Sequence, residues 1–283
     1  MLVRVVDDME LRLKDEFQYL CNKYPRVAFN RHDWNGKIRE NKDYLYAREG
    51  YITIPENYDP KIIKQYKGLI THNRKFAKEN PNLNIILTNG YVNTHNYYEL
   101  DEYLGWDEKI NGICSLHNIY KPSTNVGEII TKRQKFINSI PYPNKHTYGP
   151  KPWGVNYKGK PDANHPNHIN NLKVINKYRF VLSLEFTYHP MWSYDWITDR
   201  IYNAFKSKTI PIYYGCYNID EHIPNELFID FRKYVNNPIG LKKELESYTK
   251  QKYIDQTEKA FDFYKNSTWG NMPELEDLLR GLP

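Results

Sequence analysis

Two short groups of polar residues, each beside an apolar run, have the composition of a site for a phosphorylated ligand. Glu185 directly follows the run from Phe180 to Leu184, and Thr198, Asp199 and Arg200 open a segment with helical spacing. A helix N-terminus presents unpaired N–H groups and a partial positive charge, which suit a diphosphate, and an arginine there adds a cation. The pattern therefore predicts an anion site, although such a triplet taken alone more often caps a surface helix.

The elements that must position these residues alternate between strands and helices. Phe180 to Leu184 and Ile210 to Tyr214 predict buried strands, and Trp196 to Ser207 between them predicts a helix. Ile110 to Ser115 predicts an earlier strand, and Gly127 to Ser139 a helix after it. In open parallel sheets, ligands bind beyond the carboxyl ends of the strands, so the polar residues that follow these strands should converge at one edge.

The rest of the chain shows the same alternation less clearly. Strands are predicted at Arg26 to Phe29, at Gly68 onward and at Asn84 to Thr88, and helices at Met9 to Tyr24 and Arg74 to Glu79. Arg31 to Tyr51 is polar and predicts a long loop, and Pro141 to Asn171 predicts a loop with one short extended piece. Pro238 to Asn266 predicts two charged amphipathic helices. The chain as a whole is thus of the α/β class.

The bulk composition indicates a folded protein of two domains. With 283 residues, 40% of them hydrophobic, the chain can form two cores, and we expect domains at 1–107 and 108–283. The net charge of +6 is not gathered into basic runs, so a phosphate-bearing small molecule explains it and nucleic acid is not expected. The three cysteines, Cys21, Cys114 and Cys216, are widely spaced, which predicts reduced thiols. Without a transmembrane run or secretory signal, a cytoplasmic location is expected.

Three motifs follow one another from Tyr178 to Tyr234 with a characteristic order and spacing. They stand at Leu184 to Phe186, Thr198 to Arg200 and Ile210 to Gly215, and they continue at Asn218 to Asp220, Ile223 to Pro224 and Phe228 to Asp230. This stretch resembles the donor-binding domain of the family 10 glycosyltransferases, mostly α-1,3-fucosyltransferases, whose motifs are Phe-Glu-Asn, Thr-Glu-Lys and Ile-Pro-Ile-Tyr-Trp-Gly. The chain departs from that pattern at Phe186, at Asp199–Arg200 and in a longer loop between the first two motifs.

The resemblance implies a GT-B fold, with two Rossmann-like domains that face a cleft. The second would bind the nucleotide sugar, and the first an oligosaccharide or glycoprotein acceptor. It also implies an inverting transfer, most simply of fucose from GDP-fucose. Arg133 falls where the family places an arginine for the donor phosphate, and Tyr194 and Tyr214 offer rings that can stack on base or sugar. The expected donor-binding residues are Arg133, Glu185, Tyr194, Thr198, Asp199, Arg200 and Tyr214.

Inverting transfer requires a general base for the acceptor hydroxyl and a stabiliser for the departing diphosphate. Arg133 and Arg200 could stabilise the diphosphate, and no Asp-x-Asp motif stands in a suitable context, so neither a metal nor another cofactor is expected. The candidates for the base are Asp33, Glu49 and His72. We favour Asp33, because its neighbour Trp34 could raise the pKa of a carboxylate.

Three other functions remain open from the sequence. The first keeps the scaffold and changes the donor to a UDP-sugar such as UDP-xylose, as in glycans made by large DNA viruses of algae; the protein would then be virus-encoded and act in the host cytoplasm. Asp199 motivates this alternative, because its side chain is one methylene shorter than the family's glutamate. The second is a non-catalytic protein that binds nucleotides or carbohydrates. The third, nucleic-acid binding, rests only on mild basicity and aromatic residues.

Overall fold

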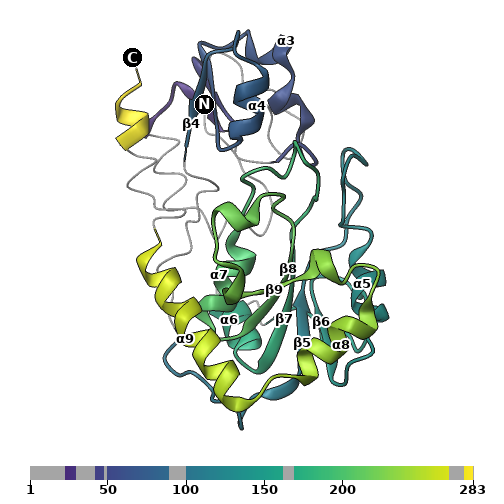
Figure 1. Cartoon of the computed structure of the whole chain (residues 1–283). Helices are drawn as coiled ribbons and strands as arrows, with labels where there is room; N and C mark the ends of the chain where they lie inside the picture. The colour runs from purple at the N-terminus through teal and green to yellow at the C-terminus, as the bar shows by residue number, and fades with distance from the viewer. Residues whose placement is uncertain are drawn as a thin grey trace.

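The chain folds into two α/β halves, each built on a parallel sheet (Figure 1). The computed structural model describes residues 23–29, 42–47, 50–88, 100–161, 169–267 and 277–282. Within these residues, none of the helices is long and apolar enough to cross a bilayer. The predicted α/β alternation is confirmed in both halves.

The sheet of the N-terminal half has four short strands in the order in which the chain makes them. These strands are β1 (Val27–Phe29), β2 (Tyr44–Tyr46), β3 (Gly68–Thr71) and β4 (Ile85–Leu87), and all neighbours are parallel. Leu45 and Leu69 are fully buried and pack in one cluster with Phe76 of α4 (Arg74–Glu79). Asn73 caps α4, because its side chain accepts a hydrogen bond from the N–H of Phe76. The predictions of β1, β3, β4 and α4 are confirmed.

One prediction in this half is wrong. The stretch from Arg31 to Tyr51, predicted as a loop, contains β2, which pairs with β1 on one side and β3 on the other. Three residues are too few to show a period of two, so the pattern could not reveal a strand. Between β2 and β3 the chain also forms two short helices, η1 (Pro55–Tyr58) and α3 (Pro60–Ile63).

The C-terminal half has a larger sheet of five parallel strands. In chain order these are β5 (Ile110–Leu116), β6 (Lys145–Tyr148), β7 (Tyr178–Leu184), β8 (Ile210–Tyr214) and β9 (Ile229–Asp230), and their spatial order is β6-β5-β7-β8-β9. Strand β6 pairs with one edge of β5, and the next strand along the chain, β7, pairs with the other edge. The direction of strand addition thus reverses between β6 and β7. Ligands of doubly wound sheets bind at such a switch, beyond the carboxyl ends of the strands that flank it. Here those strands are β5 and β7.

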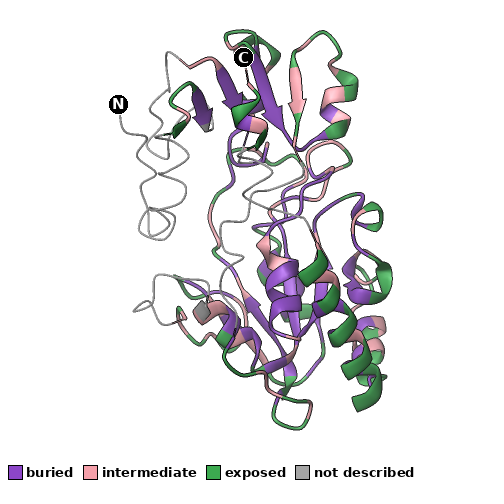
Figure 2. Ribbon diagram, turned by 90° about the vertical axis from the view of Figure 1, so that its left-hand side faces the viewer, coloured by how far each residue is buried: buried purple, intermediate pink, exposed green. Residues whose placement is uncertain are grey.

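Both faces of this sheet are covered by helices (Figures 1 and 2). Phe180, Leu182 and Leu184 of β7 point into a core shared with α5 (Arg133–Ser139) and α8 (Pro238–Glu246). Val181, between them in sequence, packs on the opposite face with α6 (Ile169–Ile175) and α7 (Asp199–Lys206). The last long helix, α9 (Lys250–Asn266), packs against α7. A strand that is apolar on both faces is typical of parallel sheets.

The predicted elements of this half are mostly confirmed, with three corrections. Helix α5 begins at Arg133 and not at Gly127, because Gly127 has a φ of +68° and Glu128 bridges to Thr187. Helix α7 begins at Asp199 and not at Trp196. The loop predicted from Pro141 to Asn171 does contain an extended piece, β6, but α6 begins within its last residues. Short 3-10 helices follow β8 and β9, namely η2 (Ile219–Glu221), η3 (Asn225–Leu227) and η4 (Phe231–Lys233).

The chain passes between the two halves more than once. Residues 100–107 already contact the C-terminal half, since the N–H of Leu104 donates to Asn176 and the ring of Trp106 packs on Tyr253. The expected division between residues 107 and 108 therefore lies inside a segment that belongs to the second half. Residues 277–282 return to lie beside the sheet of the N-terminal half (Figures 1 and 2).

Candidate functional site

Glu185 is a buried carboxylate at the switch point of the larger sheet. It directly follows β7, and none of its surface is exposed. The N–H and hydroxyl of Thr198 donate to its two oxygens at 2.9 and 2.7 Å, and Arg200 donates at 3.0 Å. Burial raises the pKa of Glu185, while Arg200 and Thr198 counteract that rise. The carboxylate thus holds the first turn of α7 against the end of β7.

The backbone around Glu185 leaves no spare volume. A Cβ atom at Gly215, just after β8, would lie 2.1 Å from Cγ of Glu185. The hydroxyl of Tyr213, one strand over, lies 3.3 Å from Oε1 of the same carboxylate. Only glycine at position 215 lets the carboxylate and the end of β8 lie side by side.

Two guanidinium groups gather around Phe186, the residue after this carboxylate. The Cζ atoms of Arg200 and Arg133 lie 4.4 and 5.3 Å from the centroid of the Phe186 ring, within cation–π range. Arg200 keeps 21% of its side chain exposed. The carboxylates of Glu185 and Asp199 raise the pKa of Arg200 against the lowering effect of burial. The structure therefore brings together Glu185, Thr198, Arg200 and Arg133, as the sequence predicted.

Arg133, at the start of α5, is a charge without a paired carboxylate. Its side chain is fully buried, and its hydrogen bonds go to the main-chain carbonyls of Asn118, Leu184 and Glu185. Its Nε has no hydrogen-bond partner among the described residues. Burial and the nearby Arg200 lower the pKa of Arg133 to about 9, so it stays protonated at neutral pH. A buried, charged donor with an unused N–H group is suited to an incoming anion.

The other predicted donor residues lie in different surroundings. Asp199 begins α7, is partly exposed and accepts from the side chain of Asn203. Tyr214, at the end of β8, stacks on Tyr188 with ring centroids 4.7 Å apart. Tyr194 lies in the second charged cluster described below, where its hydroxyl donates to Glu221.

Of the candidate bases, only His72 falls within the described residues. Asp33 and Glu49 lie outside them, so their roles stay predictions. His72 follows β3, is 4% exposed, and its ring centroid lies 4.8 Å from that of Trp196. Burial lowers the pKa of His72 to about 4, against a small opposing effect of Asp195. The imidazole is therefore neutral at pH 7 and packed against a residue of the other half.

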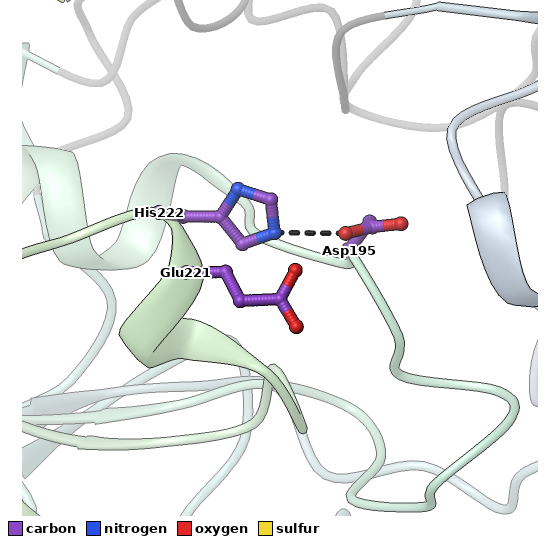
Figure 3. Close-up of side chains that lie close together, drawn as sticks. All are labelled: Asp195, Glu221 and His222. Carbon is purple, nitrogen blue, oxygen red and sulfur yellow. Dashed lines mark hydrogen bonds and ion pairs between the residues drawn. The ribbon is translucent and has the colours of Figure 1, made fainter.

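A second charged cluster joins the two halves. Figure 3 shows that Asp195, Glu221 and His222 turn their polar atoms toward one another, and those atoms all lie within 4.8 Å. Such a set could ligate a metal. However, the guanidinium of Arg74, from α4, contacts Asp195 at 2.6 Å and Glu221 at 2.8 Å. The two carboxylates are thus shared by this guanidinium, and the cluster is an ion-pair network.

Several residues of these clusters were not singled out from the sequence, and Asp195 and His117 are the most buried of them. Asp195 stands in the loop before α7, where isolated acidic residues carry no pattern that reveals a buried partner. His117, just after β5, is also buried, with Nε2 3.1 Å from the carbonyl oxygen of Leu182 and no partner for Nδ1. The signal that could have found His117 is its place at the end of a predicted strand.

Solved structures identify the fold class. The chain superposes on an α-1,3-fucosyltransferase bound to GDP with a TM-score of 0.53 at 18% identity, over 91% of this chain and 78% of that one. It also superposes on WaaG, a glycosyltransferase of lipopolysaccharide biosynthesis, with a TM-score of 0.50 at 12% identity, over 94% and 81% of the two chains. The fold is thus GT-B, with two Rossmann-like halves, as predicted.

The family follows from the sequence of the second half. The model of the C-terminal domain of glycosyltransferase family 10, the fucosyltransferases, matches residues 127–269. The chain belongs to this family. It is 31% identical over 110 residues to the Homo sapiens 4-galactosyl-N-acetylglucosaminide 3-alpha-L-fucosyltransferase 9, and the match covers 38% of this chain and 28% of the relative. The enzyme of Cricetulus griseus with the same name matches to the same extent.

Proposed function

We propose that this protein is an inverting glycosyltransferase that transfers a sugar, fucose from GDP-fucose, to a glycan acceptor without an obligatory metal. The observation that carries the proposal is the group formed by Arg133, Arg200 and Phe186 at the end of β7. Two guanidinium groups that both lie within cation–π range of Phe186, at a switch point, are suited to a diphosphate. Membership of family 10 and the likeness to a GDP-bound fucosyltransferase support the choice of donor.

The chemistry assigned to these residues is stabilisation of a leaving group. As the acceptor hydroxyl attacks the anomeric carbon, negative charge grows on the departing diphosphate, and preorganised cations lower the energy of that state. Glu185 fixes Arg200 by one charge-assisted hydrogen bond of 3.0 Å, so little reorganisation is needed. Thr198 anchors the same turn, and we assign Asp199, at the start of α7, and Tyr214, at the end of β8, to contacts with the sugar or base. The acceptor proton is assigned to a base of the N-terminal half, with Asp33 preferred over Glu49 and His72.

A UDP-sugar such as UDP-xylose is the alternative donor. Asp199 motivates it, because a shorter carboxylate would hold sugar hydroxyls at a different distance from the helix. GDP-fucose and UDP-xylose differ in both base and sugar, so their binding can be compared directly. A ligand at 100 times its Kd raises the stability of the folded state by about 2.7 kcal/mol, which a thermal-shift assay detects.

The experiment measures melting temperature and transfer with each donor, in the presence and absence of EDTA. We expect a shift with GDP-fucose, transfer that survives EDTA, and loss of both in Arg200→Ala. Arg200→Lys should retain part of the activity, since it keeps the cation. Arg280→Ala serves as the control, because Arg280 is an exposed arginine in residues 277–282, beside the sheet of the N-terminal half. Nucleotide binding without transfer or donor hydrolysis would instead show a non-catalytic binding protein.

A further inference from the structure

The loop between β7 and α7, residues 186–197, contacts the N-terminal half, and we call it the bridging loop. The ring of Trp192 stacks on Tyr51 of the N-terminal half, with centroids 3.9 Å apart and planes 8° from parallel. The side chain of Asn73 donates to the carbonyl of Met191 at 2.7 Å. The loop therefore attaches to the acceptor-side half through both apolar and polar contacts.

Asp195 is the most heavily bonded residue of the bridging loop. Its carboxylate accepts from Arg74 three times, at the main-chain N, Nε and Nη2, at 3.1, 3.0 and 2.6 Å. The side chains of Asn218 and His222, from the donor-side half, contact the same carboxylate at 2.9 and 2.8 Å. Asp195 is 2% exposed and has a φ of +59°, a left-handed conformation that few non-glycine residues adopt. Such a conformation persists only where surrounding contacts hold it.

The position of Asp195 in the chain links this contact to the candidate active site. The bridging loop leaves β7 at Glu185 and reaches α7 at Thr198, and these two residues are hydrogen-bonded to each other. The loop is thus closed at its base by the proposed donor site, and its far side is held by Arg74. The two ends of the loop are fixed in the donor-side half, whereas its middle is attached to the N-terminal half. A change in the angle between the halves must therefore strain the loop or break its contacts with the N-terminal half.

We propose that Asp195 is a positioning residue which, through Arg74, sets the distance between the acceptor-side half and the donor site. This inference rests on the proposed function. Asp195 touches neither substrate in this scheme. It acts by holding α4, and with it the acceptor-side sheet, in one orientation relative to Arg200. A misplacement of about 1 Å between reacting groups is enough to cost about 10²-fold in rate.

The test compares Asp195→Asn and Arg74→Ala with the control Glu258→Gln. Glu258 forms an ion pair of similar length with Lys208, at 2.8 Å, but both residues belong to the donor-side half. The orientation is measured in the full chain by the distance between spin labels at Lys78→Cys in α4 and Lys243→Cys in α8, with Cys21→Ser added. Cys114 and Cys216 are buried and remain unlabelled. Transfer kinetics and GDP binding are measured on the same variants without labels.

We expect Asp195→Asn and Arg74→Ala to broaden the label distances and to lower kcat about 10²-fold, with the Kd for GDP unchanged. The double variant should be no worse than the poorer single variant, because both remove the same contact. Unchanged distances overturn the proposal, whatever the activity. A weakened GDP affinity at unchanged orientation also overturns it, since Asp195 would then act only within the donor site.

The test also distinguishes a variant that does not fold from a protein that lacks the proposed function. If Asp195→Asn does not fold, Arg74→Ala decides alone, because the Arg74 side chain is 50% exposed and its removal leaves no new cavity in the core. If the unaltered protein neither binds nor transfers any sugar nucleotide, the proposed function fails and the positioning role fails with it. The label distances then still report whether the Arg74–Asp195 contact holds the halves together.

Discussion

The two charged clusters of this molecule use the same residue types but balance their charges differently. At the end of β7, Arg133 donates only to carbonyl oxygens within the described residues. Arg200 donates to the buried carboxylate of Glu185. At the junction of the halves, one guanidinium, that of Arg74, meets two carboxylates and is satisfied by them. In the first cluster, within the described residues, Nε of Arg133 has no hydrogen-bond partner and its cation has no carboxylate partner. In the second cluster the charged groups form ion pairs with one another. From this difference we propose that the first cluster takes an anion, whereas the second joins two parts of the protein.

The strongest test of this comparison replaces the arginine in each cluster by an apolar residue of similar length. We expect Arg133→Met to lower transfer by about 10²–10³-fold, the range found when one charge-stabilising donor is removed from an active site. Loss of the bonds to the buried carbonyls of Leu184 and Glu185 should also destabilise the fold by about 1–3 kcal/mol. The measurements are GDP affinity and kcat.

The matched variant at the junction is Arg74→Met. It should leave GDP affinity as in the unaltered protein, because among the described residues the side chain of Arg74 contacts Asp195, Glu221 and the ring of Tyr194. An equal loss of GDP affinity in both variants would remove the distinction between the clusters.

The next effect concerns the close packing beside Glu185. We expect Gly215→Ala to destabilise the fold by about 3 kcal/mol, since the new methyl group overlaps the Glu185 side chain and must displace it. Denaturant unfolding measures this change. Gly281→Ala is the control, because a Cβ there meets its nearest neighbour at an ordinary 3.6 Å. Similar small effects at both positions would show that the carboxylate has room to move.

A pH effect tests whether His72 is buried in its neutral form at the junction of the two halves. The pKa of His72 is about 4 in the folded state and near 6.5 when unfolded, so between these values only the unfolded chain binds the proton. Stability must fall as the pH is lowered through this window, by about 2 kcal/mol from this group at pH 5.

His72→Phe keeps a ring against Trp196 and removes the titration. Urea unfolding at pH 7 and pH 5 should therefore show a smaller acid-induced loss in this variant than in the unaltered protein. The remaining loss is expected to come in part from His117, because burial and the charges of Arg133 and Arg200 lower its pKa in the same direction. An identical loss in both proteins would mean that His72 is not buried in its neutral form.

The sequence predicted those parts of the molecule that depend on local pattern. The long strands β5, β7 and β8 have runs of apolar residues, and the motif around Thr198 and Arg200 follows one of them at short range. The proximity of Glu185 and Arg200 could be predicted for the same reason, because the two residues stand on either side of a single loop.

Contacts between distant segments could not be predicted in this way. Asp195 meets Arg74 across 121 positions of the chain, and no spacing rule relates two such residues. Strand β2 is only three residues long, and its pairing with β1 and β3 is decided by tertiary contacts. The unpaired charge of Arg133 is likewise a property of the folded interior, since a lysine- and arginine-rich segment reads as an exposed helix from its composition.

The smallest expected effect distinguishes the two carboxylates of the junction. The side chain of Glu221 is 48% exposed and forms a solvent-exposed ion pair with Arg74, whereas the side chain of Asp195 is buried. Glu221→Gln should therefore cost only about 0.2–1 kcal/mol, less at high salt, because exposed ion pairs are screened. Asp195→Asn should cost more and depend less on salt, since the hydrogen bonds of His222, Arg74 and Asn218 hold the pKa of Asp195 below its usual range despite burial. Unfolding at low and at high salt measures both, and a strong salt dependence for Asp195→Asn would contradict the burial on which its positioning role depends.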